Sequence, residues 1–97
     1  PWMSFCSDAG SYSDLSKEFK THPRAFGSFA RVLGKYSRDL GLLSLETAIH
    51  KLSGLPATNL GLQKRGFLKV GHYADIVLFD PLKINFHVTK CVTKIYS

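Results

Sequence analysis

The sequence predicts an α/β fold, because the spacing of its apolar residues changes along the chain. Residues 24–40 carry apolar side chains at alternating spacings of three and four, which is typical of one face of a helix. Residues 1–7 and 67–79 carry short apolar runs bounded by Asp, Gly or Pro, which are typical of strands. With 44% hydrophobic and 12% aromatic residues, the composition is that of a globular chain, so these elements are expected to pack together.

The first half of the chain is predicted to form a strand, a loop and a helix. The strand covers residues 1–7 and ends at Asp8, and a polar loop follows. Pro23 suits the start of the helix, because its missing N–H would have no partner there. Gly27 and Gly34, one heptad apart, predict a side of the helix that another element approaches closely. The apolar face is expected to hold Phe26, Phe29, Leu33, Tyr36 and Leu40, and the basic face Arg24, Arg31, Lys35 and Arg38.

Two shorter helical segments are predicted next. Gly41 ends the first helix, and Ser44 is placed to cap a helix over residues 45–52. Pro56 opens a further helical turn that Gly61 closes, because glycine readily adopts the left-handed conformation found after helix ends.

The remaining apolar runs are predicted to be strands. Residues 67–70 and 74–79 form two of them, joined by a turn at Gly71 and His72. The second run is apolar on both faces, so it is expected to be buried on both sides. One more strand is expected over residues 91–96.

The charge of the chain raises two alternatives to an enzyme. The net charge is +6, and the basic face of the helix over residues 24–40 is suited to follow a phosphate backbone. The aromatic residues of that helix lie on the opposite face, where they cannot stack on bases, so nucleic-acid binding is disfavoured. The other alternative is an interaction module without catalysis that self-associates through an exposed strand edge.

The apolar runs and the cysteines predict the surroundings of the chain. No apolar run approaches the roughly 20 residues needed to span a bilayer, so no membrane partner is expected. Cys6 and Cys91 lie far apart in the sequence, which favours two reduced thiols over a disulfide. A cytoplasmic protein is therefore predicted.

Two stretches of the sequence resemble a known family. The first is Ser7-Asp8-Ala9-Gly10 together with the run HPRAFGSFARVLGKY, which starts at His22. It resembles the C-terminal part of the N-acyl-D-amino-acid deacylases (D-aminoacylases) of the metal-dependent amidohydrolase superfamily. The second stretch runs from SGLPA at Ser53 to GHYADIVLFDP, which ends at Pro81, and it looks like the closing segment shared widely in that superfamily. The resemblance covers roughly the first 84 residues.

The resemblance implies that this chain is the C-terminal fragment of a larger fold. A (β/α)8 barrel takes about 250 residues, whereas this chain has 97. Residues 1–60 would be the end of the barrel, with its last strand and helix, and residues 61–84 would be strands of a small flanking β-sandwich. Residues 85–97 would be a divergent tail. The remainder of the barrel would then be a partner of this chain, and self-association of the fragment is also expected.

The same resemblance implies roles for three residues. Asp8 would take a proton from the metal-bound water that attacks the amide and return a proton to the leaving amine. Arg24 would bind the α-carboxylate of a small N-acyl amino acid, and His22 would be a weaker substrate contact. Without the resemblance, Asp8 caps a loop, Arg24 is one more solvated cation, and His22 is a loop residue that forms hydrogen bonds.

Zinc is implied by the resemblance, although this sequence does not carry a set of ligands. The histidines are scattered, with no pair at ligand spacing: His22, His50, His72 and His87. The main ligands are therefore expected outside this chain, with Asp8 as its only contact to the metal. The longer parent protein is expected to hydrolyse the amide bond of N-acyl-D-amino acids, and the 97-residue chain alone is expected to be inactive.

Overall fold

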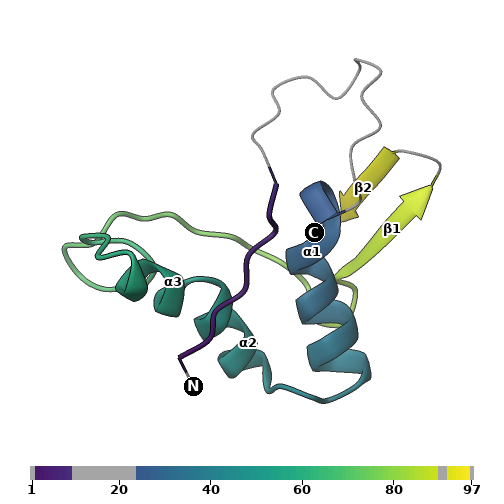
Figure 1. Ribbon diagram of the computed structural model, residues 1–97, viewed down its shortest axis with the longest axis horizontal. Coiled ribbons are helices and arrows are strands. Elements are labelled where there is room, and N and C mark those ends of the chain that lie inside the picture. The colour runs from purple at the N-terminus through teal and green to yellow at the C-terminus, as the bar shows by residue number, and fades with distance from the viewer. Residues whose placement is uncertain (1, 10–23, 90–91, 97) are drawn as a thin grey trace.

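A computed structural model describes residues 2–9, 24–89 and 92–96 (Figure 1). Its side chains are described for residues 2–9 and 27–85. The elements, in order, are α1 (Arg24–Arg31), the π-helix η1 (Val32–Asp39), α2 (Leu45–Leu52), α3 (Gly54–Asn59), β1 (Asn85–Thr89) and β2 (Val92–Tyr96). The hairpin of β1 and β2 lies beside α1, whereas α2 and α3 lie on the other side of the long helix (Figure 1).

The long helix predicted over residues 24–40 is present, and its second half is wound more widely than expected. Helix α1 continues directly into η1, and the Leu40 N–H donates to the Lys35 carbonyl, five residues earlier, at 2.9 Å. That spacing is the hydrogen-bond pattern of a π-helix. Gly41, at φ +60°, then ends the helix as predicted.

The buried face of this helix differs from the predicted one. Phe29 and Leu40 are 47% and 53% exposed in this chain, and the remainder of the barrel, against which the apolar face was expected to pack, lies outside it. Leu33 is buried as predicted, and the other buried positions include the small residues Gly34 and Ser37. The reason is close approach by the chain before β1: a Cβ on Gly34 would lie 2.6 Å from the Ile84 carbonyl oxygen. The predicted contact side is therefore confirmed at Gly34.

The two shorter helices follow the local signals. The Ser44 hydroxyl accepts a hydrogen bond from the Thr47 N–H at 3.1 Å, so the predicted cap of α2 is confirmed. Helix α3 begins at Gly54, earlier than the predicted start at Pro56. It is closed by Gly61, at φ +67°, in the expected role.

The predicted strands at 1–7, 67–70 and 74–79 are not strands in the described part of the chain. The described sheet contains only β1 and β2, paired antiparallel from Asn85↔Tyr96 to Thr89↔Val92. The remaining prediction, a strand over residues 91–96, coincides with β2. A strand forms only where a neighbouring strand accepts and donates its backbone hydrogen bonds. No described segment does this for the other three runs.

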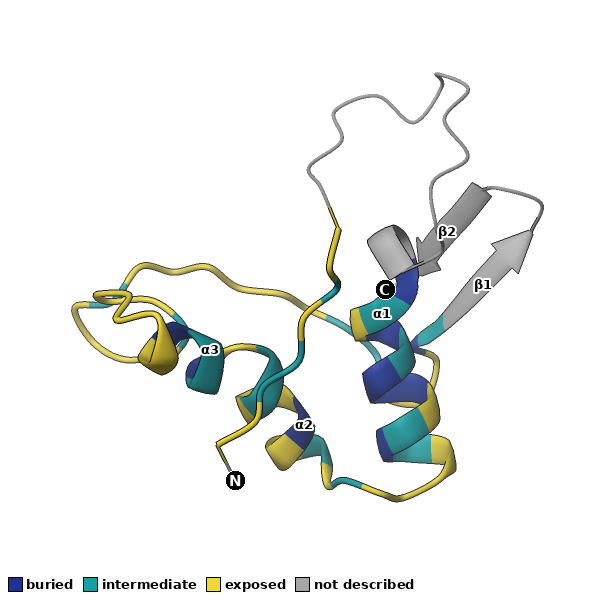
Figure 2. Ribbon diagram, in the orientation of Figure 1, coloured by how far each residue is buried: buried dark blue, intermediate teal, exposed yellow. Residues whose placement is uncertain are grey.

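Burial of the second apolar run is also not as predicted. Ile76, Val77 and Leu78 are 65%, 82% and 88% exposed, although burial on both sides was expected. Figure 2 shows the long segment between α3 and β1 as mostly exposed. Phe79, at the end of the run, packs against the core, whereas Ile76, Val77 and Leu78 have little cover among the described residues.

The core is small and lies between the long helix, α2 and the turn before β1. Its buried members are Ala30, Val32, Leu33, Ala48 and Ile84, with Phe5 and Phe79 packed against them. None of the large side chains among residues 2–9 and 27–85 is fully buried. No helix in the described ranges is long and apolar enough to cross a membrane.

The exposed apolar side chains lead to a first prediction. The purified 97-residue chain is expected to self-associate and to increase the fluorescence of a hydrophobic dye, because large apolar patches are seldom left uncovered in monomers. Size-exclusion chromatography and dye titration measure the two effects. A monomeric, dye-silent chain with a cooperative melt would show instead that these residues form a complete domain.

Candidate functional site

Asp8 has an unusual backbone conformation. Its φ is +52°, in the left-handed region, and its N–H donates to the Cys6 sulfur at 3.4 Å. Residues with a side chain seldom adopt this conformation, although Asp does so more readily than most. Such conformations cost about 1–3 kcal/mol and are concentrated at functional sites. Lys64 has a similar conformation at φ +59°, so the conformation is compatible with a role for the exposed Asp8 without assigning one.

The segment that carries Asp8 is attached to the C-terminal end of α2. The Phe5 N–H donates to the Lys51 carbonyl at 3.1 Å, and the Lys51 ammonium donates to the Met3 carbonyl at 2.7 Å. The last carbonyls of a helix have no partner within the helix, so they readily accept bonds from a neighbouring chain. These two bonds fix the segment a few residues before Asp8.

The other two predicted site residues cannot be placed against Asp8. Arg24 is the first residue of α1, and its side chain lies outside the described part. His22 lies outside the described residues altogether. The structure therefore leaves open whether these three residues meet.

The described histidines have different surroundings. The His50 ring, on α2, is 6.4 Å from the Phe67 ring, and Nδ1 of His72 is buried without a hydrogen-bond partner among the described residues. His87 lies in β1, and its side chain is not described. Across the described ranges, no group of three or more His, Cys, Asp or Glu side chains could hold a metal ion. These residues therefore do not fit a complete metal site by themselves.

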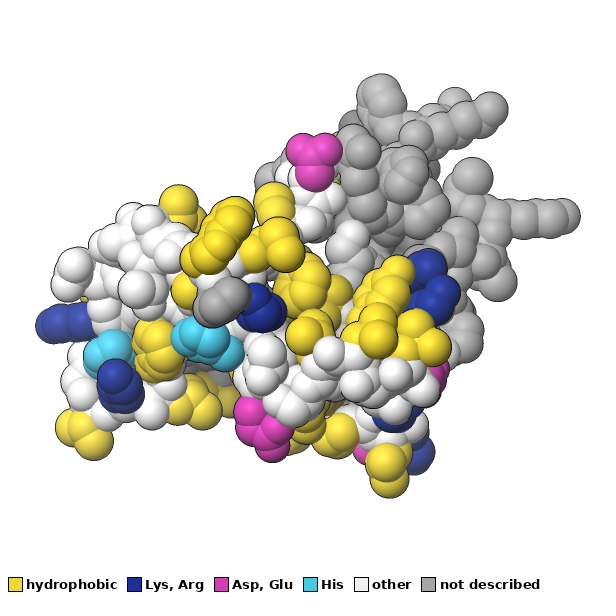
Figure 3. Space-filling view, turned by 60° about the horizontal axis from the view of Figure 1, so that its bottom comes forward, with side chains coloured by type: hydrophobic (Ala, Val, Ile, Leu, Met, Phe, Trp, Pro, Cys, Tyr) yellow, Lys and Arg dark blue, Asp and Glu magenta, His cyan; other side chains and the backbone are white. Residues whose placement is uncertain are grey.

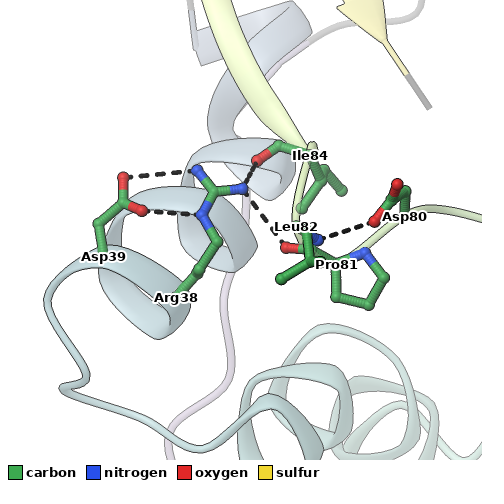
Figure 4. A network of polar contacts seen from close by, with 6 residues as sticks. All are labelled: Arg38, Asp39, Asp80, Pro81, Leu82 and Ile84. Carbon is green, nitrogen blue, oxygen red and sulfur yellow. Dashed lines mark hydrogen bonds and ion pairs between the residues drawn. The ribbon is translucent and has the colours of Figure 1, made fainter.

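A polar network around Arg38 was not foreseen from the sequence (Figure 4). The Arg38 Nε donates to the Asp39 Oδ1 at 2.8 Å, and Nη1 donates to the Ile84 carbonyl at 2.6 Å and to the Pro81 carbonyl at 3.4 Å. The hydrogen bond from Arg38 lowers the pKa of Asp39, and the bond to Asp39 raises the pKa of Arg38. In the sequence Arg38 is one cation on a basic face, and the two carbonyl groups that it binds lie 43 and 46 positions away.

Most basic side chains near the aromatic residues also have partners inside the chain. Arg31 and Lys35 each lie 5.8 Å from the centre of the Tyr36 ring, and the hydrogen bond from Arg31 lowers the pKa of Tyr36. Arg65 pairs with Asp75 and lies over the Tyr73 ring at 4.4 Å. On the face shown in Figure 3, Lys and Arg side chains occur in several separate places among hydrophobic ones. This arrangement does not favour a continuous basic track for a nucleic acid.

Comparison with known proteins confirms the family resemblance. The amidohydrolase family pattern matches residues 11–95. An N-acyl-D-aspartate deacylase of Alcaligenes xylosoxydans xylosoxydans is 54% identical over 63 residues, which are 65% of this chain and 13% of that protein.

Two solved structures give the same result in three dimensions. A D-aminoacylase is 59% identical with a TM-score of 0.62, covering 63% of this chain and 13% of its own. The N-acyl-D-glutamate deacylase of Bordetella bronchiseptica, complexed with zinc and a phosphonate mimic of the tetrahedral intermediate, is 46% identical with a TM-score of 0.68. The latter match covers 70% of this chain and 14% of the other.

This chain thus spans about a seventh of the length of the relatives it matches. Within that span, both the sequence and the path of the backbone agree with theirs, and the family pattern extends over most of the 97 residues. The chain therefore belongs to the amidohydrolase family.

Proposed function

We propose that this chain is the C-terminal part of a zinc-dependent amidohydrolase that hydrolyses the amide bond of N-acyl-D-amino acids. The observation that carries the proposal is the 59% identity to a D-aminoacylase of solved structure, together with a common backbone path. The 54% identity to an N-acyl-D-aspartate deacylase supports the same substrate class. The chain would supply the last strand and helix of a (β/α)8 barrel, and part of the flanking β-sandwich.

In this proposal Asp8 is the general acid–base group. Active sites of barrel enzymes lie at the carboxyl ends of the strands, and Asp8 follows an apolar run in the sequence. Its carboxylate would accept a proton from the water that attacks the amide carbonyl, and would return a proton to the amine that leaves. The left-handed backbone at Asp8 fits a side chain placed for a purpose other than packing.

Arg24 is proposed to bind the α-carboxylate of the substrate. Its guanidinium offers a planar pair of donors that matches two carboxylate oxygens. It is the first residue of α1 and follows Asp8 by 16 positions in the sequence. His22, two residues before Arg24 in the sequence, is proposed as a weaker contact to the same substrate.

Zinc is proposed from the relatives. The Bordetella deacylase is complexed with zinc, and a solved D-aminoacylase has a binuclear metal centre. The described residues of this chain do not form a ligand set, so the groups that hold zinc would lie outside them. The part left to this chain is the movement of protons at Asp8 and the binding of the substrate carboxylate at Arg24.

An interaction module without catalysis is the second candidate. The observation that favours it is the exposed apolar run at Ile76, Val77 and Leu78, which offers an uncovered surface to another chain. The same exposure is expected of a segment that is covered by the rest of a larger domain. The similarity to enzymes along most of the chain therefore favours the hydrolase.

A chimeric enzyme distinguishes the hydrolase from the interaction module. The C-terminal segment of a D-aminoacylase that matches this chain is replaced by the 97 residues, and zinc-supplemented protein is assayed with an N-acetyl-D-amino acid. We expect turnover by the chimera and none by the 97-residue chain alone or by the same D-aminoacylase truncated before the segment. A folded but inactive chimera would contradict the proposed function. Turnover by the isolated chain would contradict its assignment as a fragment.

A further inference from the structure

We infer that Arg38 is a positioning residue that locks the long helix of α1 and η1 onto the turn before β1. By doing so, it fixes the place of the helix N-terminus, where Arg24 lies. The inference rests on the proposed function, because it assigns Arg38 an effect on substrate binding by Arg24. Arg38 itself is not proposed to touch the substrate.

This contact, which we call the lock, consists of Gly34, Arg38 and the carbonyl oxygen of Ile84. Gly34 approaches it so closely that an added Cβ would lie 2.6 Å away, and Nη1 of Arg38 donates to it at 2.6 Å. Ile84 is only 7% exposed and belongs to the core. Two successive turns of η1 therefore hold the same backbone atom, one by shape and the other by a hydrogen bond.

Hydrogen bonds to Asp39 fix the orientation of the Arg38 guanidinium. Nε and Nη2 donate to the two Asp39 oxygens at 2.8 and 3.4 Å, which leaves Nη1 for the carbonyls of Ile84 and Pro81 (Figure 4). This arrangement needs the rigid, forked geometry of arginine, because a lysine ammonium is a single point of charge on a flexible stem. Arg38→Lys therefore keeps the charge while removing the bridge.

The turn that receives Arg38 is rigid for a separate reason. The Asp80 carbonyl accepts from the N–H groups of Lys83 at 3.1 Å and Ile84 at 2.9 Å, and the Asp80 side chain accepts from the Leu82 N–H at 2.9 Å. A turn closed at three points presents the Pro81 and Ile84 carbonyls in fixed directions. A movement at Ile84 is thus passed on to the chain that follows it.

The segment that follows Ile84 runs back along the long helix as the hairpin of β1 and β2. Strand β1 starts directly after Ile84, and both β1 and β2 contact α1. Figure 1 shows the hairpin beside α1. The long helix is therefore attached twice to one continuous segment, at η1 through the lock and at α1 through the hairpin. If the lock is lost, the hairpin can shift along α1, and the first turn of α1 is no longer held in place.

Variants of the chimera test this inference, with kcat and KM measured for an N-acetyl-D-amino acid and for its carboxamide, which lacks the carboxylate. Arg38→Lys and Gly34→Ala break the lock by different means. Each is expected to raise KM for the acid about tenfold, because misplacement of a binding group by about 1 Å can cost up to about 100-fold. KM for the carboxamide and kcat for both substrates should change little.

The control is Lys35→Ala, which removes an exposed cation of η1 that takes no part in the lock and should leave both KM values unchanged. Circular dichroism and melting curves show whether each variant folds. Equal changes for the acid and the carboxamide, or no change in a folded Arg38→Lys variant, would overturn the inference. An inactive unmodified chimera would instead overturn the proposed function, so the two failures are distinguishable.

Discussion

Replacing Asp8 with Asn in the chimera is expected to lower kcat by about 10²–10⁴, the usual contribution of a general acid–base group. Asn has nearly the shape of Asp and also tolerates the left-handed backbone found at this position, so this backbone conformation should be preserved. What is lost is the carboxylate that accepts the proton. The measurement is kcat for an N-acetyl-D-amino acid, with the zinc content of each preparation determined in parallel.

Asp75→Asn is the matched control for this change. Asp75 is an exposed carboxylate paired with Arg65, so the same chemical change there should leave kcat within about twofold, as for most surface positions. A folded Asp8→Asn variant that also retains kcat would show that the Asp8 carboxylate takes no part in proton transfer. Loss of zinc together with loss of activity would assign Asp8 to metal binding rather than to proton transfer.

Arg24→Ala is expected to lower kcat/KM by roughly ten- to a hundredfold. A hydrogen bond to a charged group contributes about 1.5–3 kcal/mol, and this free energy converts directly into the loss of kcat/KM. Part of the loss should appear in KM, because the contact is made before the reaction as well as during it. The assay compares an N-acetyl-D-amino acid with its carboxamide, for which the effect should be smaller.

Arg24→Lys separates charge from geometry in the same assay. It should fall between the parent and Arg24→Ala, since a single ammonium can pair with one carboxylate oxygen but cannot match the planar fork. If Arg24→Ala weakens acid and carboxamide equally, Arg24 is a structural cation and its proposed role is wrong.

Features of this fold that depend on nearby residues could be predicted from the sequence. Gly41 and Gly61 both have positive φ after a helix, and the Ser44 hydroxyl bonds to the Thr47 N–H three residues later. Each of these features is decided within one turn of the chain. The limits of the long helix and of α2 followed from such local signals.

Features that depend on distant residues could not be predicted. The side of the long helix that is buried is set by Ile84, which meets Gly34 only after the chain has returned. Apolarity alone therefore does not show that the small residues Gly34 and Ser37 are the ones buried within this chain, while Phe29 is exposed. The same holds for the run at 74–79, because its pattern shows which surfaces need cover but not whether a partner strand is present.

The part of the candidate site that depends on neighbouring residues could be predicted from the sequence. Asp8 stands at the end of an apolar run, and the structure adds its left-handed backbone, which no sequence pattern had indicated. Arg38 had no comparable signal, since its role depends on carbonyl groups, which every residue possesses. The meeting of Asp8, Arg24 and His22 stays a prediction.

The small core affects how long these residues would persist in a cell if they were made by themselves. Chaperones and proteases act on chains with exposed apolar surface, and a marginal free energy of folding changes abundance several-fold. A chain in which no described large side chain is fully buried should be removed quickly when it is made by itself. Its abundance would then depend on whether a polypeptide that covers its exposed segment is synthesised at the same time.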